Sequence, residues 1–232
     1  MMEKVRVSAA LVLLLSAFSG GVAALGDNVQ LQARVAQIKS AIAANKQMLA
    51  QYTWQQFETI SVKGDIKKQE TYQVLIGPDG QQQKAPESEQ SQSGRQREHG
   101  IKHHMTEEYE NYGKAIAALA QSYAQPDPGK IQYVYQQGQV TLGSAGAPNT
   151  AAIVIHNYVK QGDSVTLVFN TALKAMLAAN VATYLSDPSD AVTIAAQFAQ
   201  LSDGTNYVQN LTINGSSKSL TVQESNSNFQ KR

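Results

Sequence analysis

The second half of the chain alternates apolar and polar residues with a period of two. Four such runs follow residue 151, and their apolar positions are Val165, Leu167 and Phe169; Val192, Ile194 and Phe198; Leu211 and Ile213; and Leu220 and Val222. A period of two places apolar side chains on one face of a strand, as in half-buried antiparallel sheets. Turn-forming segments at 161–163, 186–190, 202–204 and 214–216 separate the runs. The pattern therefore predicts an antiparallel sheet with one apolar face that needs a cover.

Two stretches in the first half repeat apolar residues every three or four positions, which predicts amphipathic helices. The first covers 28–51, with Asp27 or Asn28 as its N-cap. The second begins near Ile101, continues through Tyr112 and Ile116 to Tyr123, and stops at the prolines of 126–128. A short third helix is predicted over 128–137, because it starts with proline and ends just before a glycine.

A hairpin is predicted between the two long helices. Trp54, Ile60 and Val62 share strand parity, residues 63–65 turn the chain, and a second strand carries Tyr72, Val74 and Ile76 to the turn at 77–80. A third strand is expected to begin at 81–84. Residues 85–98 are rich in Gln, Ser, Glu and Arg, which predicts a flexible polar loop.

The predicted helices and the predicted sheet each have one apolar face. Neither is stable alone in water, so we expect the apolar faces to pack against each other. The predicted fold class is α+β. It consists of a curved antiparallel sheet, an unclosed half-barrel, with two long helices and one short helix covering its concave face.

The first residues predict export. Lys4 and Arg6 precede an apolar run, 7–18, that is too short to span a bilayer, and Val22-Ala23-Ala24 fits the small-residue rule of signal peptidase. A retained membrane anchor is the alternative, but the run ends well short of the roughly 20 residues that an anchor needs. We expect a signal peptide over 1–24, cleavage after Ala24, and a periplasmic location. The remaining 208 residues (232 − 24) form one predicted domain, 25–232.

Charge and cysteine content narrow the possible partners. Without Glu3, Lys4 and Arg6, the chain has 17 basic residues (19 − 2) and 17 acidic residues (18 − 1). This balance argues against nucleic acid or an anionic membrane surface as the main partner. The sequence has no cysteine, which excludes a disulfide framework, a thiolate metal site and a lipid-modified cysteine. We therefore expect a protein without a membrane anchor.

Candidate chemistry is sparse. His99, His103 and His104 lie near two glutamates and could in principle bind a metal, but no His-Glu-x-x-His motif is present and a solvated helix start is favoured. Glu58, Asp65 and Glu70 on the first hairpin could pair as acid and base, but exposed strand carboxylates are the more common explanation. No serine stands in Gly-x-Ser-x-Gly. The sequence predicts neither an enzyme nor a cofactor.

The layout resembles the LolA/LolB-like superfamily of periplasmic carriers. The shared features are the signal peptide, an opening helix that leads into Tyr52-Thr53-Trp54, a helical insertion after the first hairpin, and a closing meander. Segments 72–80, 157–163 and 182–188 are also similar to those of uncharacterised secreted bacterial proteins. The resemblance implies an unclosed β-barrel plugged by helices, with a hydrophobic cavity that shields an acyl chain or another lipid-like ligand.

We therefore expect a non-catalytic binding or carrier protein for a hydrophobic ligand. The expected ligand-lining residues are Trp54, Tyr72, Val165, Leu167, Phe169, Ile194, Phe198 and Leu211. Trp54 has two interpretations, since it either anchors the first helix on the sheet or lines the mouth of the cavity with Tyr72. The alternative function is a cell-envelope structural or interaction module with a filled core, which contacts another protein through 85–98 or a sheet edge.

Overall fold

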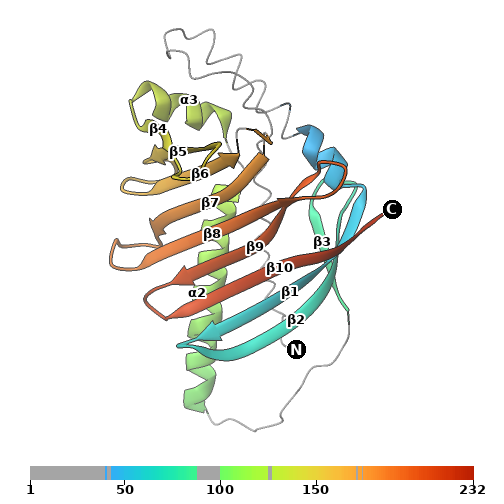
Figure 1. The fold of residues 1–232 in the computed structure, drawn as a ribbon. Helices are drawn as coiled ribbons and strands as arrows, with labels where there is room; N and C mark the ends of the chain where they lie inside the picture. The colour runs from blue at the N-terminus through green and yellow to red at the C-terminus, as the bar shows by residue number, and fades with distance from the viewer. Residues whose placement is uncertain (1–39, 41–42, 88–99, 125–126, 171, 174) are drawn as a thin grey trace.

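The computed structural model describes residues 40, 43–87, 100–124, 127–170, 172–173 and 175–232 (Figure 1). The helices are α2 (Gly100–Ala124), α3 (Pro128–Gln136) and a segment at 43–49. The strands are β1 (Tyr52–Val62), β2 (Asp65–Ile76), β3 (Gln82–Pro86), β4 (Val140–Ser144), β5 (Thr150–His156), β6 (Ser164–Asn170), β7 (Ala175–Tyr184), β8 (Ala191–Gln200), β9 (Asn206–Gly215) and β10 (Leu220–Lys231). None of the described helices has both the length and the apolar composition of a membrane-spanning segment.

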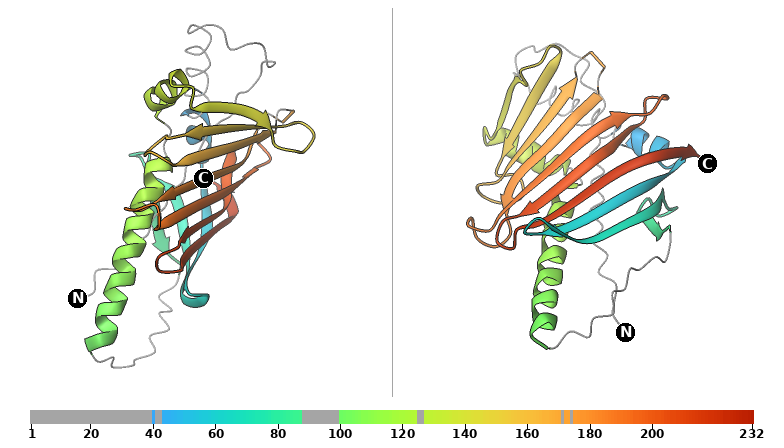
Figure 2. Two further views of the ribbon diagram at one scale, coloured as in Figure 1. Left: turned by 90° about the vertical axis from the view of Figure 1, so that its left-hand side faces the viewer. Right: turned by 60° about the horizontal axis from the view of Figure 1, so that its bottom comes forward.

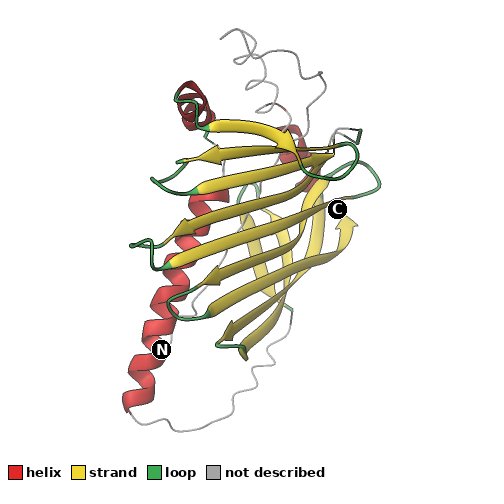
Figure 3. Cartoon of the chain, turned by 60° about the vertical axis from the view of Figure 1, so that its left-hand side comes forward, coloured by secondary structure: helices red, strands yellow, loops and turns green. Residues whose placement is uncertain are grey.

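The described strands form one antiparallel sheet in the order β3-β2-β1-β10-β9-β8-β7-β6-β5-β4. Strands β4 to β10 follow one another as a meander, and β1 then pairs with β10, from Tyr52 opposite Lys231 to Val62 opposite Leu220. The sheet is curved and unclosed, with β3 at one edge and β4 at the other (Figures 1 and 3). The predicted α+β class and the half-barrel are thereby confirmed.

Helix α2 packs on the apolar, concave face of the sheet (Figure 2). Ile116 and Ala120 of this helix are fully buried against the alternating apolar residues of β6 to β10, including Ile194 and Ile213. Helix α3 adds Val134 to the same cluster, near the β4 edge. The main apolar cluster therefore joins both helices to the larger part of the sheet.

A second apolar cluster lies at the other end of β1. Leu49, from the helical residues 43–49, packs with Trp54, Val74 and Ile76. The indole of Trp54 also stacks on Phe229, with 5.5 Å between the ring centroids. The described helix ends at residue 49, two residues before the predicted end at 51, and the contact with Leu49 agrees with the interpretation of Trp54 as the anchor of this helix. Residues 28–39, 41 and 42 of the predicted helix lie outside the described residues.

The prediction of a polar loop at 85–98 is wrong at its start. Ala85 and Pro86 belong to β3, where they pair with Gln73 and Tyr72. A strand at the edge of a sheet is held by backbone hydrogen bonds and tolerates polar residues and proline, so the absence of apolar side chains did not exclude it. Residues 88–98 lie outside the described residues. Helix α3 ends one residue earlier than predicted, and Gly138 follows with φ +70°.

The outer face of the sheet carries no charge along its central row. One residue from each of nine neighbouring strands forms this row, in cross-strand register: Gln69, Thr59, Gln223, Thr212, Ala195, Asn180, Thr166, Val154 and Thr141. Solvent-facing surfaces normally contain about a quarter to a third charged residues. The convex face is thus polar but electrically neutral along its middle.

A glycine on β9 sets how closely α2 approaches the sheet. A Cβ atom added to Gly215 would lie 2.6 Å from the ring of Tyr112, which comes from α2. The Tyr112 ring cannot easily move away, because its hydroxyl donates a 2.6 Å hydrogen bond to Asp190 in the turn before β8. Gly143 on β4, by contrast, has no atom within 4 Å of such a Cβ.

We expect Gly215→Ala to lower the free energy of unfolding by about 1–3 kcal/mol, because the new methyl group forces α2 away from the sheet. Gly143→Ala is the matched control, since it adds the same methyl group to an open strand position, and we expect a change within about 1 kcal/mol. Urea unfolding of both variants measures the difference. Equal stabilities for the two variants would contradict the close contact at Gly215.

Candidate functional site

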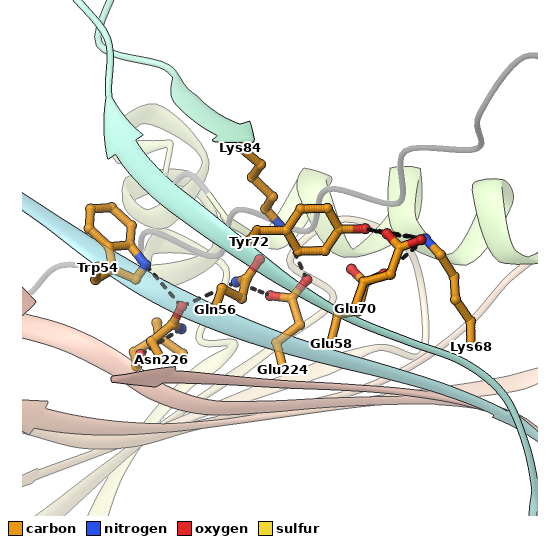
Figure 4. A network of polar contacts seen from close by, with 10 residues as sticks. Trp54, Gln56, Glu58, Lys68, Glu70, Tyr72, Lys84, Glu224 and Asn226 are labelled. Carbon is orange, nitrogen blue, oxygen red and sulfur yellow. Dashed lines mark hydrogen bonds and ion pairs between the residues drawn. The ribbon is translucent and has the colours of Figure 1, made fainter. Parts of the chain in front are cut away.

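Polar side chains interrupt the apolar lining of the concave face where β3, β2, β1 and β10 lie side by side (Figure 4). We call this group the polar belt, and its members are Gln56, Glu58, Lys68, Glu70, Tyr72, Lys84, Glu224 and Asn226. On β1 the belt lies between Trp54 of the second apolar cluster and Ile60, which packs on the main apolar cluster. The belt therefore separates two apolar regions of one surface.

Three carboxylates form a row across the belt. Glu58 on β1 is the cross-strand partner of both Glu70 on β2 and Glu224 on β10. Like charges directly opposite one another destabilise a sheet. Two of the three are nearly inaccessible, because Glu58 is 2% exposed and Glu224 is 4% exposed.

The expectation that the hairpin carboxylates are exposed is thus wrong for Glu58. Glu58 has the inward parity of Trp54 and Ile60, and that parity outweighs the usual preference of a carboxylate for water. Asp65, at the start of β2, is exposed as expected. Sequence reasoning missed Glu224, although it continues the inward series of Leu220 and Val222 and could have been found from that series.

Two lysines face the carboxylates. The Lys84 ammonium lies 3.4 Å from a carboxylate oxygen of Glu224, and both side chains are buried. The Lys68 ammonium lies 3.0 Å from Glu70 and 3.7 Å from Glu58. Tyr72 donates its hydroxyl hydrogen to Glu70. Strand β3 thus supplies a positive charge to Glu224. The sequence predicts only that a strand begins in this segment.

Burial changes the protonation of the two inner carboxyls. Loss of solvent raises the pKa of Glu224 to about 7, more strongly than the neighbouring Lys84 lowers it. Loss of solvent likewise raises the pKa of Glu58 above its ordinary value. Burial therefore favours the protonated form of both inner carboxyls, against the opposite effect of the neighbouring lysines.

Two amides fix the hydrogen bonds beside the carboxylates. The Gln56 Nε2 atom donates to Glu224 Oε2 at 3.0 Å and to Asn226 Oδ1 at 3.2 Å. Asn226 Oδ1 also accepts from the Trp54 indole at 2.9 Å, while its Nδ2 donates to the backbone carbonyl of Val208. Both partners of Gln56 Nε2 are acceptors, so a flipped amide would place oxygen against oxygen. The other amide atom, Gln56 Oε1, is buried and accepts no hydrogen bond.

The expected ligand-lining residues all lie on the concave face but not in one group. Trp54 and Tyr72 lie at the belt and the second apolar cluster. The other six are buried in the main apolar cluster, and they are Val165, Leu167, Phe169, Ile194, Phe198 and Leu211. Their role in binding a ligand stays a prediction.

Another buried carboxylate, Asp163, is fully satisfied by the fold. It accepts hydrogen bonds from the backbone N–H groups of Tyr158, Val159 and Lys160 at 2.6–2.9 Å, and from the hydroxyl of Tyr123. This carboxylate closes the loop between β5 and β6 and fastens α2 above it. Asp163 therefore has a structural role in this loop and at α2.

The histidine hypothesis finds no support in the described part of the chain. His103 and His104 lie in α2, but their side chains are not among those that the structure describes, and His99 lies outside the described residues. No group of three or more His, Asp or Glu side chains that could hold a metal ion occurs among the described residues.

Comparisons with known proteins assign no family and no function to the chain. No protein-family model matches the chain, and no curated protein matches it. Among solved structures, the chain is similar to the crystal structure of a DUF1329 family protein from Desulfovibrio piger. The TM-score is 0.41 and the identity 9%, over 87% of this chain and 90% of that chain. At this level of similarity, no residue role is transferred from that protein.

The raised pKa of Glu224 predicts a pH-dependent stability. The folded protein holds a proton that the unfolded chain releases between its ordinary pKa of 4.5 and the folded value of about 7. The stability linked to this proton is fully present below about pH 4.5 and is lost as the pH rises through 7. Glu224→Gln keeps the side-chain shape but does not titrate. We expect the wild type to match E224Q at about pH 4.5 and to be less stable by up to about 3 kcal/mol at about pH 8.

Urea unfolding across this pH range measures the effect. Glu87→Gln is the control, because it makes the same chemical change at an exposed carboxylate next to β3 that lies outside the polar belt. A constant difference between the wild type and E224Q would show that Glu224 does not titrate in this window.

Proposed function

We propose that this protein is a non-catalytic binding or carrier protein of the bacterial cell envelope for a hydrophobic ligand, such as the acyl chain of a lipid. The observation that carries the proposal is the concave face of the open sheet, where two apolar clusters flank a buried polar belt. Binding sites for amphiphilic ligands combine an apolar lining with a few placed polar groups. The layout of the chain, with its leader-like start and its resemblance to the LolA/LolB-like superfamily, supports the same function and a periplasmic location.

The belt argues for a ligand that is not purely apolar. A buried amide oxygen without a hydrogen bond costs about 1–3 kcal/mol, and two buried carboxylates in register add to that cost. A filled core of well-packed apolar residues at these positions would avoid both costs. A ligand that contacts the belt offsets these costs by giving the polar groups partners. The apolar clusters on either side then accommodate the remainder of an amphiphile.

The first test is native mass spectrometry of protein purified from its own organism, followed by lipid extraction. We expect a bound hydrophobic molecule to be recovered with the folded protein. A fluorescent fatty-acid analogue provides the second measurement, since it reports binding to the delipidated protein. No recovered lipid together with no response to the analogue would overturn the carrier function.

A pair of phenylalanine variants locates the site. Phe198 is buried on the concave face, whereas Phe57 lies on the outer face and is 43% exposed. We expect Phe198→Leu to weaken binding of the analogue about threefold to tenfold, because it removes part of the apolar lining, while the fold is retained. Phe57→Leu makes the same chemical change on the opposite face and should leave binding unchanged.

A second candidate function is an envelope interaction module. The two edges of the described sheet, β3 and β4, favour it, because the outer backbone groups of an edge strand can pair with a strand of another protein. Under this function no lipid is recovered, and the two phenylalanine variants behave alike toward the analogue. The same measurements therefore separate the two functions.

A further inference from the structure

The polar belt contains hydrogen-bond acceptors that the described protein groups do not fully use. Gln56 is 2% exposed, and its Oε1 atom accepts no hydrogen bond. The Gln56 amide is held against Glu224, and Glu224 is the cross-strand partner of Glu58. One neutral acceptor and two carboxylates thus lie on neighbouring positions of β1 and β10, all on the concave face (Figure 4).

We propose that the polar belt is a subsite for a primary ammonium group, which is carried by the head group of the amphiphilic ligand. This inference rests on the proposed function and names the chemistry of its ligand. An ammonium group has three N–H donors and one positive charge. It supplies a donor to Gln56 Oε1 and offsets the negative charge of Glu58 and Glu224.

Other head groups fit the belt less well. An anionic group would lie against two carboxylates that already oppose each other across β1 and β10. A quaternary ammonium carries the charge but has no N–H, so it leaves Gln56 Oε1 without a donor. A hydroxyl group donates one hydrogen bond but brings no positive charge to the two buried carboxylates, Glu58 and Glu224.

The surroundings of the subsite suit a chain attached to the ammonium. Next to the belt on β1 and β10, Ile60 and Val222 continue into the main apolar cluster. On the other side, Trp54 and Val74 begin the second apolar cluster. A head group at the belt therefore has an apolar surface on both sides for the hydrocarbon part of the molecule.

The test uses three lysophospholipids with the same acyl chain and phosphate, which differ only in ethanolamine, choline or glycerol as the head group. Isothermal titration of the delipidated full chain gives the three affinities. We expect the ethanolamine lipid to bind about tenfold more tightly than the other two, because it alone has a primary ammonium group. Free ethanolamine is a further arm, which distinguishes an amphiphile from a small amine as the source of the ammonium.

Two variants test the acceptors. Glu224→Gln removes one negative charge and Gln56→Leu removes the unused acceptor, so each should reduce the preference for ethanolamine to about twofold or less. Urea unfolding of both variants serves as the check that they are folded. Gln223→Leu is the matched control, because Gln223 is the neighbour of Glu224 on β10 but is exposed on the outer face. It should keep the full preference.

Each outcome has a distinct meaning. Equal binding of the three lipids, or a preference that survives in both belt variants, overturns the ammonium subsite but leaves the carrier function standing. Absence of binding by all three lipids overturns the carrier function and the amphiphilic ligand together. Binding of free ethanolamine, with the same loss in E224Q and Q56L, supports the ammonium subsite and assigns it to a small amine.

Discussion

A sheet with one apolar face cannot persist in water unless something covers that face, and helix α2 is the main described cover. The helix is held by more than apolar contact. Tyr112 and Tyr123, three turns apart on the same side of α2, donate their hydroxyls to Asp190 and Asp163, in the turns before β8 and β6. Two loops of the sheet thus fasten the helix that stabilises the sheet. The close approach at Gly215 is possible because glycine has no Cβ atom, and the hydrogen bond to Asp190 fixes where the Tyr112 ring lies.

Along the middle of the sheet, charge lies on the concave side and is absent from the central row of the outer face. The concave side carries a row of three carboxylates. Natural sequences rarely place a polar group against the requirements of the fold without a functional reason. Asp163 shows that this chain can satisfy a buried carboxylate completely when the role is structural. Among the described residues, Asn206 at the start of β9 also has a buried amide oxygen without a hydrogen bond, but in the polar belt that feature lies beside Glu224 and Glu58, which are both buried.

Much of the architecture could be predicted from the period of the apolar residues. The buried positions of β6, β8 and β9, the stripe of α2 and the proline start of α3 all follow from local patterns. Strand order could not be predicted in this way, because the partner of β1 lies about 170 residues away and no local signal names it. The inward side chains of Glu58 and Glu224 cannot be predicted from residue type, because carboxylates are usually exposed, and only their place in the alternating pattern of β1 and β10 indicates them. The start of strand β3 can be predicted from the sequence but its end cannot, since an edge strand depends on backbone partners more than on apolar residues.

The pairing of β1 with β10 affects the order in which the parts of the sheet can pair during folding. The last strand of the chain does not lie at the rim but is inserted into the sheet, between β1 and β9. Contacts between segments so far apart in sequence form late, because the chain must first close a long loop. Without residues 220–231, the hairpin of β1 and β2 has no strand that pairs it with the meander. The same residues include Glu224 and Asn226, so the pairing of β10 completes the sheet and the polar belt together.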